Sequence, residues 1–147
     1  DGRDSHVFVF VGDGECDEGQ VWEAAQFAAH YKLDNLVCFV DSNKRQLDGA
    51  VEDIMSHGKG LRAKFDAFGW NAIELEDGND VEQIYDAVQE AYATKGQPTA
   101  IILNTIKGKG ATFAESTGAH SSQPTPEQWE EAIAAAEAEL AAVKAAK

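Results

Sequence analysis

The chain has 147 residues, 44% of them hydrophobic, and a formal net charge of −14 at pH 7. This length suffices for one domain with a real core, and no apolar run approaches the roughly 20 residues that span a bilayer. The acidic balance argues against nucleic acids and anionic membranes as partners, because both favour a basic face, but a bound metal and backbone N–H groups can still attract an anionic cofactor.

The first half of the chain alternates apolar runs with a helical pattern. Residues 7–11 are uniformly apolar and predict a strand buried on both faces. Residues 20–32 place apolar side chains at helical spacing, and residues 36–40 form a second strand of the buried type. The glycine-interrupted segment 44–59 is expected to be a loop.

The second half continues the alternation. A short helix is expected over residues 61–68, with Gly69 just after its end, and a third strand over residues 70–75. The next helix starts after Asn79 or Asp80, either of which can cap it. Its expected apolar face consists of Val81, Ile84, Tyr85, Val88 and Tyr92.

The last part of the chain contains one more strand and one more helix. Residues 99–105 predict the fourth strand, and the Gly-, Ser- and Thr-rich segment 107–123 is too long to be only a connector. A final helix opens at Thr125 or Pro126. Its expected apolar face consists of Trp129, Ile133, Ala136, Leu140 and Val143.

This order of strands and helices predicts an α/β fold, with a mostly parallel sheet and helices on both faces. Ligands of such sheets bind at the carboxyl ends of the strands. Three polar clusters fall at such ends: Gly12-Asp13-Gly14, Asp41-Ser42-Asn43 and Lys107-Gly108-Lys109-Gly110. The sequence therefore predicts a binding site at this edge.

The first two clusters suit a metal–diphosphate unit. Asp13 offers an anionic oxygen, Asn43 a neutral one, and the carbonyl of Arg45 a third, which are the hard ligands that Mg²⁺ prefers. The flanking glycines let backbone N–H groups approach phosphate oxygens, and the helix that opens near Gly19 adds a favourable dipole. By itself, Gly-Asp-Gly is more often only a turn, and it fits the G-x-G-x-x-G nucleotide fingerprint poorly.

A longer stretch carries a family resemblance. Gly12-Asp13-Gly14 followed by Asn43 matches the thiamine diphosphate fingerprint, and residues 12–25 (Gly-Asp-Gly-Glu-Cys-Asp-Glu-Gly-Gln-Val-Trp-Glu-Ala-Ala) resemble transketolases, above all the N-terminal subunit of the two-chain kind. Residues 29–36 and 65–70 extend the similarity, which covers nearly the whole chain. It implies a thiamine diphosphate-binding domain of the diphosphate type over residues 1–147.

The resemblance also implies roles for single residues. Asp13, Asn43 and the main-chain oxygen of Arg45 would hold Mg²⁺ or Ca²⁺. The residues expected to bind the cofactor are Gly12, Asp13, Gly14, Glu15, Asn43 and Lys107. The expected catalytic residues are Glu18, near the subunit interface, and His120, which would face diphosphate and substrate although the glycine that usually follows this histidine is missing.

The same resemblance predicts what the chain needs from elsewhere. Family members have a long segment before the first strand, and the opening at Asp1 is interpreted as a trimmed N-terminus, although an artificial boundary would look the same. The glutamate that activates the cofactor belongs to a pyrimidine domain, which is a separate chain in two-chain enzymes. We therefore expect a dimer or heterotetramer that acts on sugar phosphates, with no activity for this chain alone.

Three alternatives stay open at this point. The chain could belong to another thiamine diphosphate enzyme, such as a deoxyxylulose-phosphate synthase or a dehydrogenase E1 component, or it could be a non-catalytic remnant or a plain nucleotide-binding domain. The two cysteines, Cys16 and Cys38, lack ligand spacing, so neither zinc nor a disulfide is expected. With no signal peptide visible, the expected compartment is the cytoplasm.

Overall fold

A computed structural model describes residues 4–115 and 123–145 of the chain. It contains two compact units, Asp1–Thr105 and Ile106–Lys147. The central sheet of the first unit has four parallel strands in the order β1-β2-β6-β5. These strands are β1 (Val7–Gly12), β2 (Leu36–Asp41), β5 (Asn71–Leu75) and β6 (Thr99–Leu103).

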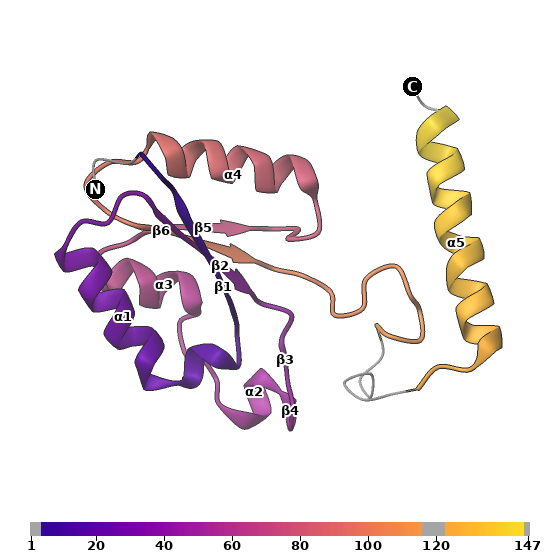
Figure 1. Ribbon diagram of the computed structural model, residues 1–147. Coiled ribbons are helices and arrows are strands. Elements are labelled where there is room, and N and C mark those ends of the chain that lie inside the picture. The colour runs from indigo at the N-terminus through magenta and orange to yellow at the C-terminus, as the bar shows by residue number, and fades with distance from the viewer. Residues whose placement is uncertain (1–3, 116–122, 146–147) are drawn as a thin grey trace. The chain divides into compact units, whose positions relative to one another are not determined.

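Helices cover both faces of this sheet, which confirms the predicted fold class (Figure 1). On one face, α1 (Gly19–His30) and α3 (Leu61–Ala67) pack through Ala25, Ala28 and Phe65. On the other face, α4 (Val81–Ala93) packs through its small residues Ala87 and Ala91. The sheet therefore separates two apolar clusters.

The strand β6 is one of the two interior strands of the sheet, with β2, and its five residues are all buried. It lies between β2 and β5, so its backbone groups have neighbours on both sides. Because successive side chains of a strand point to opposite faces, Ile102 belongs to the cluster under α1 and α3, and Ile101 to the cluster under α4. The prediction of a buried fourth strand is confirmed.

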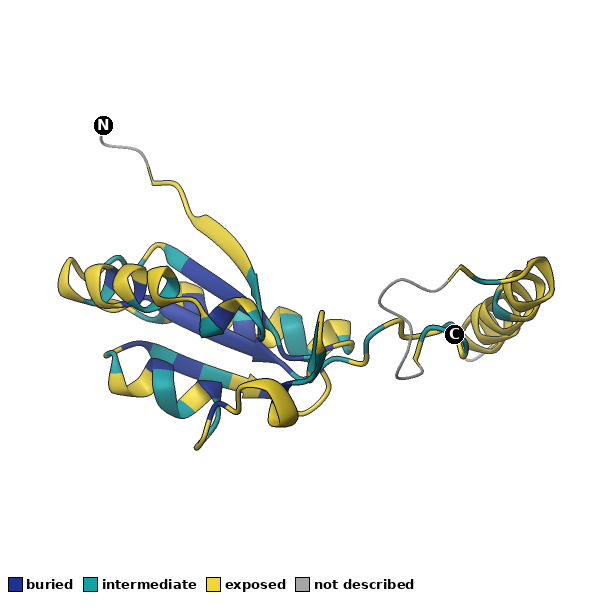
Figure 2. Cartoon of the chain, turned by 90° about the horizontal axis from the view of Figure 1, so that it is seen from below, coloured by how far each residue is buried: buried dark blue, intermediate teal, exposed yellow. Residues whose placement is uncertain are grey.

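The prediction for the first strand is wrong in one respect. Residues 7–11 do form a strand, but β1 is an edge strand and its side chains are exposed, with Val7 at 52% and Phe10 at 67% (Figure 2). Among the described residues, β1 pairs only with β2, so one of its edges and much of both its faces stay uncovered. A uniformly apolar composition indicates a strand, but it does not decide where in the sheet the strand lies.

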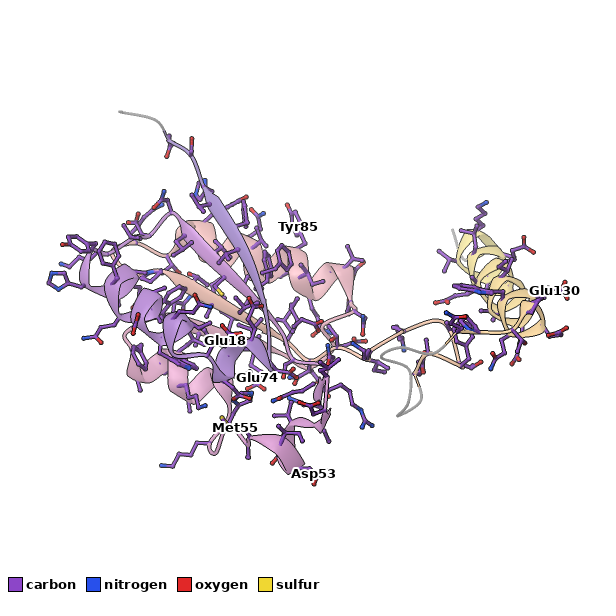
Figure 3. All side chains as sticks on the ribbon, turned by 60° about the horizontal axis from the view of Figure 1, so that its bottom comes forward. Glu18, Asp53, Met55, Glu74, Tyr85 and Glu130 are labelled. Atoms are coloured by element: carbon purple, nitrogen blue, oxygen red, sulfur yellow. The ribbon has the colours of Figure 1, made fainter. Side chains whose placement is uncertain are left out.

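The contact face of α4 also differs from the prediction. Val81 and Tyr85 are 76% and 62% exposed, and the side chain of Tyr85 points outward from the helix (Figure 3). Small alanines allow the helix to approach the sheet closely, with larger residues only flanking the contact. The cap is as expected, because the side chain of Asp80 accepts hydrogen bonds from the backbone N–H groups of Glu82 and Gln83.

Two connections have more structure than the sequence indicated. A one-turn 3₁₀ helix, η1 (Glu15–Asp17), follows β1. The segment predicted to be a loop contains the short strands β3 (Arg45–Gln46) and β4 (Gly49–Ala50), which pair antiparallel, and the single-turn helix α2 (Val51–Ile54). The expectation of an irregular 44–59 loop is therefore corrected.

The predicted end of the short helix α3 is confirmed. The chain leaves α3 through Gly69, whose φ of 86° lies in the left-handed region. Glycine adopts that conformation without the strain that a Cβ atom would cause.

The two cysteines are both buried and free. Burial raises the pKa of each thiol to about 12. Both side chains belong to the apolar cluster under α1 and α3, so they act as small core residues.

The second unit contains the predicted final helix, α5 (Pro126–Ala145). Within this unit the ring of Phe113 packs against that of Trp129, with the ring centres 5.2 Å apart. In residues 4–115 and 123–145 no helix combines the length and the apolar character needed to cross a bilayer.

Candidate functional site

Asp13 lies in the turn directly after β1, and only 2% of its surface is exposed. One carboxylate oxygen, Oδ1, accepts a hydrogen bond from the backbone N–H of Gly14 at 2.8 Å, and the other, Oδ2, accepts one from that of Lys44 at 2.7 Å. The backbone N–H of Asp13 donates to the carbonyl of Asp41 at 3.0 Å. The turn is thereby fixed to the end of β2.

Asn43 is oriented by the carboxylate that closes β2. Its amide nitrogen donates to Oδ2 of Asp41 at 3.0 Å, and its amide oxygen accepts from the backbone N–H of Arg45 at 2.9 Å. Asp41 is held in turn by the hydroxyl of Thr105, which donates to its other oxygen. These contacts set which end of the Asn43 amide is the oxygen.

Lys44, the residue after Asn43, reaches Asp13 through an unusual backbone conformation. Its φ is 64°, in the left-handed region that non-glycine residues seldom adopt. In this conformation its N–H reaches Asp13, while its ammonium group donates to Ser42 and Asn104 at 2.7 and 3.0 Å. Strain of this kind persists where the surrounding contacts enforce it, and it is frequent at functional sites.

The carboxyl of Asp13 is destabilised as an anion. Burial raises its pKa above the usual value and the nearby Asp41 adds to this effect, although the backbone N–H groups of Lys44 and Gly14 oppose it. A cation placed beside such a carboxylate would stabilise the charged form. The electrostatics therefore favour a bound cation.

The residues present fit a divalent cation that carries phosphate. Each oxygen of Asp13 accepts one hydrogen bond and, as a carboxylate oxygen, retains capacity for another ligand. The described residues contain no group of three or more His, Cys, Asp or Glu side chains able to hold a metal. A metal here would thus rely on amide, carbonyl, phosphate and water oxygens beside Asp13, as Mg²⁺ commonly does.

The turn also offers backbone donors to an anion. The N–H of Gly12 donates to a carboxylate oxygen of Glu15 at 3.1 Å. The Glu15 carboxylate oxygen occupies the position at which an oxygen of an anionic ligand could accept the same hydrogen bond from Gly12. Glu18 lies exposed at the N-cap of α1 (Figure 3), where a carboxylate is favoured by the helix dipole.

The other predicted residues are placed as follows. Arg45 begins β3, directly after the Asn43 turn. Lys107 lies in the second compact unit, and its role stays a prediction. His120 lies outside the described residues.

One residue of this region could not be found from the sequence. His57 has no motif partner along the chain, which predicts an ordinary loop histidine, but it is buried, and its Nδ1 lies 3.6 Å from Asp17 and 3.2 Å from the ammonium of Lys64. Burial and the neighbouring Lys64 lower its pKa, against the opposing effect of Asp17 and Asp13. No sequence motif joins these positions, so only folding could reveal the cluster.

Comparison with known proteins decides the family. The family model for the thiamine diphosphate-binding domain of transketolase matches residues 1–141. This chain belongs to the transketolase family. The resemblance noted in its sequence is thereby confirmed, and thiamine diphosphate is the cofactor of the matched domain.

Curated relatives agree with this assignment. The chain is 44% identical over 134 residues to the 6-deoxy-6-sulfo-D-fructose transketolase subunit SqwG of Clostridium sp. (strain MSTE9), covering 90% of this chain and 48% of that protein. It is 39% identical to one subunit of the apulose-4-phosphate transketolase of Phocaeicola vulgatus, covering 90% and 47%. The chain therefore spans about half the length of these transketolase subunits.

The solved structures show the same fold. The transketolase of Campylobacter jejuni matches with a TM-score of 0.79 at 29% identity, over 88% of this chain and 20% of that chain. Transketolase from Pichia stipitis in complex with sedoheptulose-7-phosphate matches with a TM-score of 0.78 at 32% identity, over 85% and 18%. The α/β architecture of this transketolase-family chain is thus shared with complete enzymes.

Proposed function

We propose that this chain supplies the diphosphate- and metal-binding part of a two-chain transketolase. The enzyme would move a two-carbon ketol unit from a ketose phosphate to an aldose phosphate. One observation carries the proposal: Asp13 and Asn43 stand after neighbouring parallel strands, where Asp13 accepts a hydrogen bond from the N–H of Lys44 and Asn43 accepts one from the N–H of the next residue, Arg45. The family match and the names of the two curated relatives support it.

The binding roles are those that the family resemblance implies, and this geometry supports them. Asp13, the amide oxygen of Asn43 and the carbonyl of Arg45 would hold Mg²⁺, with Ca²⁺ as a substitute. Diphosphate oxygens would replace the Glu15 carboxylate at the N–H of Gly12. The metal would then relieve the electrostatic cost of keeping Asp13 charged.

The remaining roles complete the proposal. Thiamine diphosphate, when bound, would supply the carbanion chemistry of the ketol transfer. Lys107 and His120 would contact diphosphate and substrate, and Glu18 would lie near the interface with a pyrimidine-domain subunit that activates the cofactor. The glutamate that activates the cofactor belongs to that partner subunit, so the chain alone is expected to be inactive.

The metal assignment can be tested by calorimetry on the assembly of this chain with its pyrimidine-domain subunit. Thiamine diphosphate is titrated with and without Mg²⁺ into the wild type, Asp13→Ala and Asp86→Ala, an exposed aspartate on α4 that serves as the matched control. We expect Mg²⁺-dependent binding in the wild type and the control, and its loss in Asp13→Ala. Unchanged affinity in Asp13→Ala would overturn the assignment.

The reaction class can be tested on the same assembly. The relatives are named for different sugars, so a panel of ketose donors and aldose acceptors is required, with product analysis. We expect two-carbon transfer without release of CO₂. Decarboxylation of a 2-oxo acid would instead assign the chain to another class of thiamine diphosphate enzyme.

A further inference from the structure

The side chain of Gln46 packs against the turn that contains Asp13, at the position of Gly14. Gly14 has φ −66° and ψ −33°, a conformation open to any residue. A Cβ atom at this position, however, would lie 2.9 Å from Cγ of Gln46 and 3.2 Å from its Cδ. A larger residue at position 14 would therefore have to displace the side chain of Gln46, although the backbone conformation would allow it.

Gln46 is itself fixed by Asp17. Its amide nitrogen donates to Oδ2 of Asp17 at 2.8 Å, which joins β3 to the end of η1. The backbone N–H of Asp17 donates to the carbonyl of Gly14 at 3.2 Å. Gly14, Asp17 and Gln46 therefore form a closed loop of contacts, and a shift in one displaces the others.

His57 and Lys64 complete the support on the other side of Asp17. The second oxygen of Asp17 lies 3.6 Å from Nδ1 of His57, and the ammonium of Lys64 lies 3.2 Å from the same nitrogen. That ammonium also lies 5.3 Å from the ring centre of Trp22 on α1. The turn after β1 is thus connected to α1 and α3 through a single carboxylate.

This arrangement is not explained by stability alone. Nε2 of His57 is buried and, among the described residues, makes no hydrogen bond of good geometry, although the backbone of Asp13 is close enough to act on the pKa of His57. His57, Asp13 and Ser42 line a cavity of about 70 Å³. A buried polar atom without a well-aligned hydrogen bond is costly to the fold, so packing alone does not account for a histidine at position 57.

We propose that Gln46, Asp17 and His57 are positioning residues, which hold the Gly12–Gly14 turn in the shape that metal and diphosphate require. The inference rests on the proposed function, since it concerns the same site. None of the three needs to touch the cofactor. They act through Gly14, whose N–H contacts Asp13, the proposed metal ligand.

The test measures binding of thiamine diphosphate and Mg²⁺ to the assembly with the pyrimidine-domain subunit, and urea unfolding of the same variants without ligand. Gln46→Ala is expected to raise the dissociation constant by about 10- to 100-fold, the usual cost of removing a residue that orients metal ligands. The unfolding midpoint should change little. Gln89→Ala, exposed on α4, is the matched control and should bind as the wild type does.

A rescue distinguishes positioning from general damage. Gln46→Glu places two carboxylates together and should bind as poorly as Gln46→Ala. Combining it with Asp17→Asn restores one donor and one acceptor with their roles exchanged, and should recover most of the affinity. Wild-type affinity in Gln46→Ala, or no recovery in the double variant, would overturn the inference, whereas a wild type that binds no cofactor would overturn the proposed function itself.

Discussion

Two strands of the sheet, β6 and β1, are similar in composition but opposite in environment. All residues of β6 are buried, whereas β1 exposes Phe8 at 44% and Phe10 at 67%. Edge position alone is not the cause, because β5 is also an edge strand and buries Ala72 and Leu75. The faces of β5 are covered by α3 and α4, whereas the faces of β1 are largely uncovered in the described part of the chain. An apolar run therefore specifies a strand, while the elements packed on its faces decide how far its side chains are buried.

The residue that follows the carboxyl end of β1 is buried, unlike the strand itself. Asp13 is 2% exposed although it directly follows the exposed strand. Its burial comes from contacts with the end of β2 and with Lys44. The site is therefore held by polar contacts of the turn, and the exposed body of β1 contributes little to it.

The largest expected effect is in β6. Ile101→Ala should lower the free energy of unfolding by about 2–5 kcal/mol, because it leaves a cavity in a closely packed core. Ile101 is fully buried in the cluster under α4. Urea denaturation measures the loss, and Ile101→Val should cost only about 0.5–1.5 kcal/mol; equal losses for the two would contradict the cavity account.

Two glycines, Gly78 beside the end of β6 and Gly12 at the end of β1, allow the packing at the carboxyl ends of these strands to be compared. A Cβ at Gly78 would lie 2.7 Å from the carbonyl carbon of Leu103 at the end of β6, whereas a Cβ at Gly12 would meet nothing within 4 Å. Gly78→Ala should therefore cost about 1–3 kcal/mol through overpacking. Gly12→Ala should change the unfolding midpoint of the unliganded chain far less, and a reversal of this order would contradict the packing seen at these ends.

A smaller effect is expected in the body of β1. Phe10→Ala should cost about 0.5–1 kcal/mol, because its ring is mostly exposed and, within residues 4–115 and 123–145, stacks only on Phe39, with the ring centres 4.7 Å apart. The measurement is again urea unfolding, made at several protein concentrations. A loss as large as that of Ile101→Ala would show that β1 is covered in solution.

The last prediction concerns pH at the polar end of β1. The pKa of His57 is lowered from its usual 6.5, so the contribution of neutral His57 is fully present above pH 6.5 and is lost as the pH falls through the folded-state pKa. Between about pH 7.5 and 5, unfolding free energy should decrease more steeply in the wild type than in His57→Gln. Parallel pH profiles would show that His57 is not held neutral in the fold.

Local patterns were sufficient for the elements that depend on local chemistry. The apolar runs predicted all four strands of the central sheet, and Asp80 and Gly69 marked helix boundaries through capping and a positive φ. Neither the exposed position of β1 nor the alanine contact of α4 could be predicted. Both depend on which elements are neighbours in space, and a sequence pattern does not contain that information.

For the proposed site, the sequence by itself determined which chemical groups are available. The order Gly12-Asp13-Gly14 followed by Asn43 selects oxygen ligands and backbone donors, and the order of strands brings them to one edge of a parallel sheet. The tertiary structure alone decided the contacts among Asp17, Gln46 and His57, which we propose to support that site. These residues come from separate segments, and their contacts exist only once the sheet and α3 have brought those segments together.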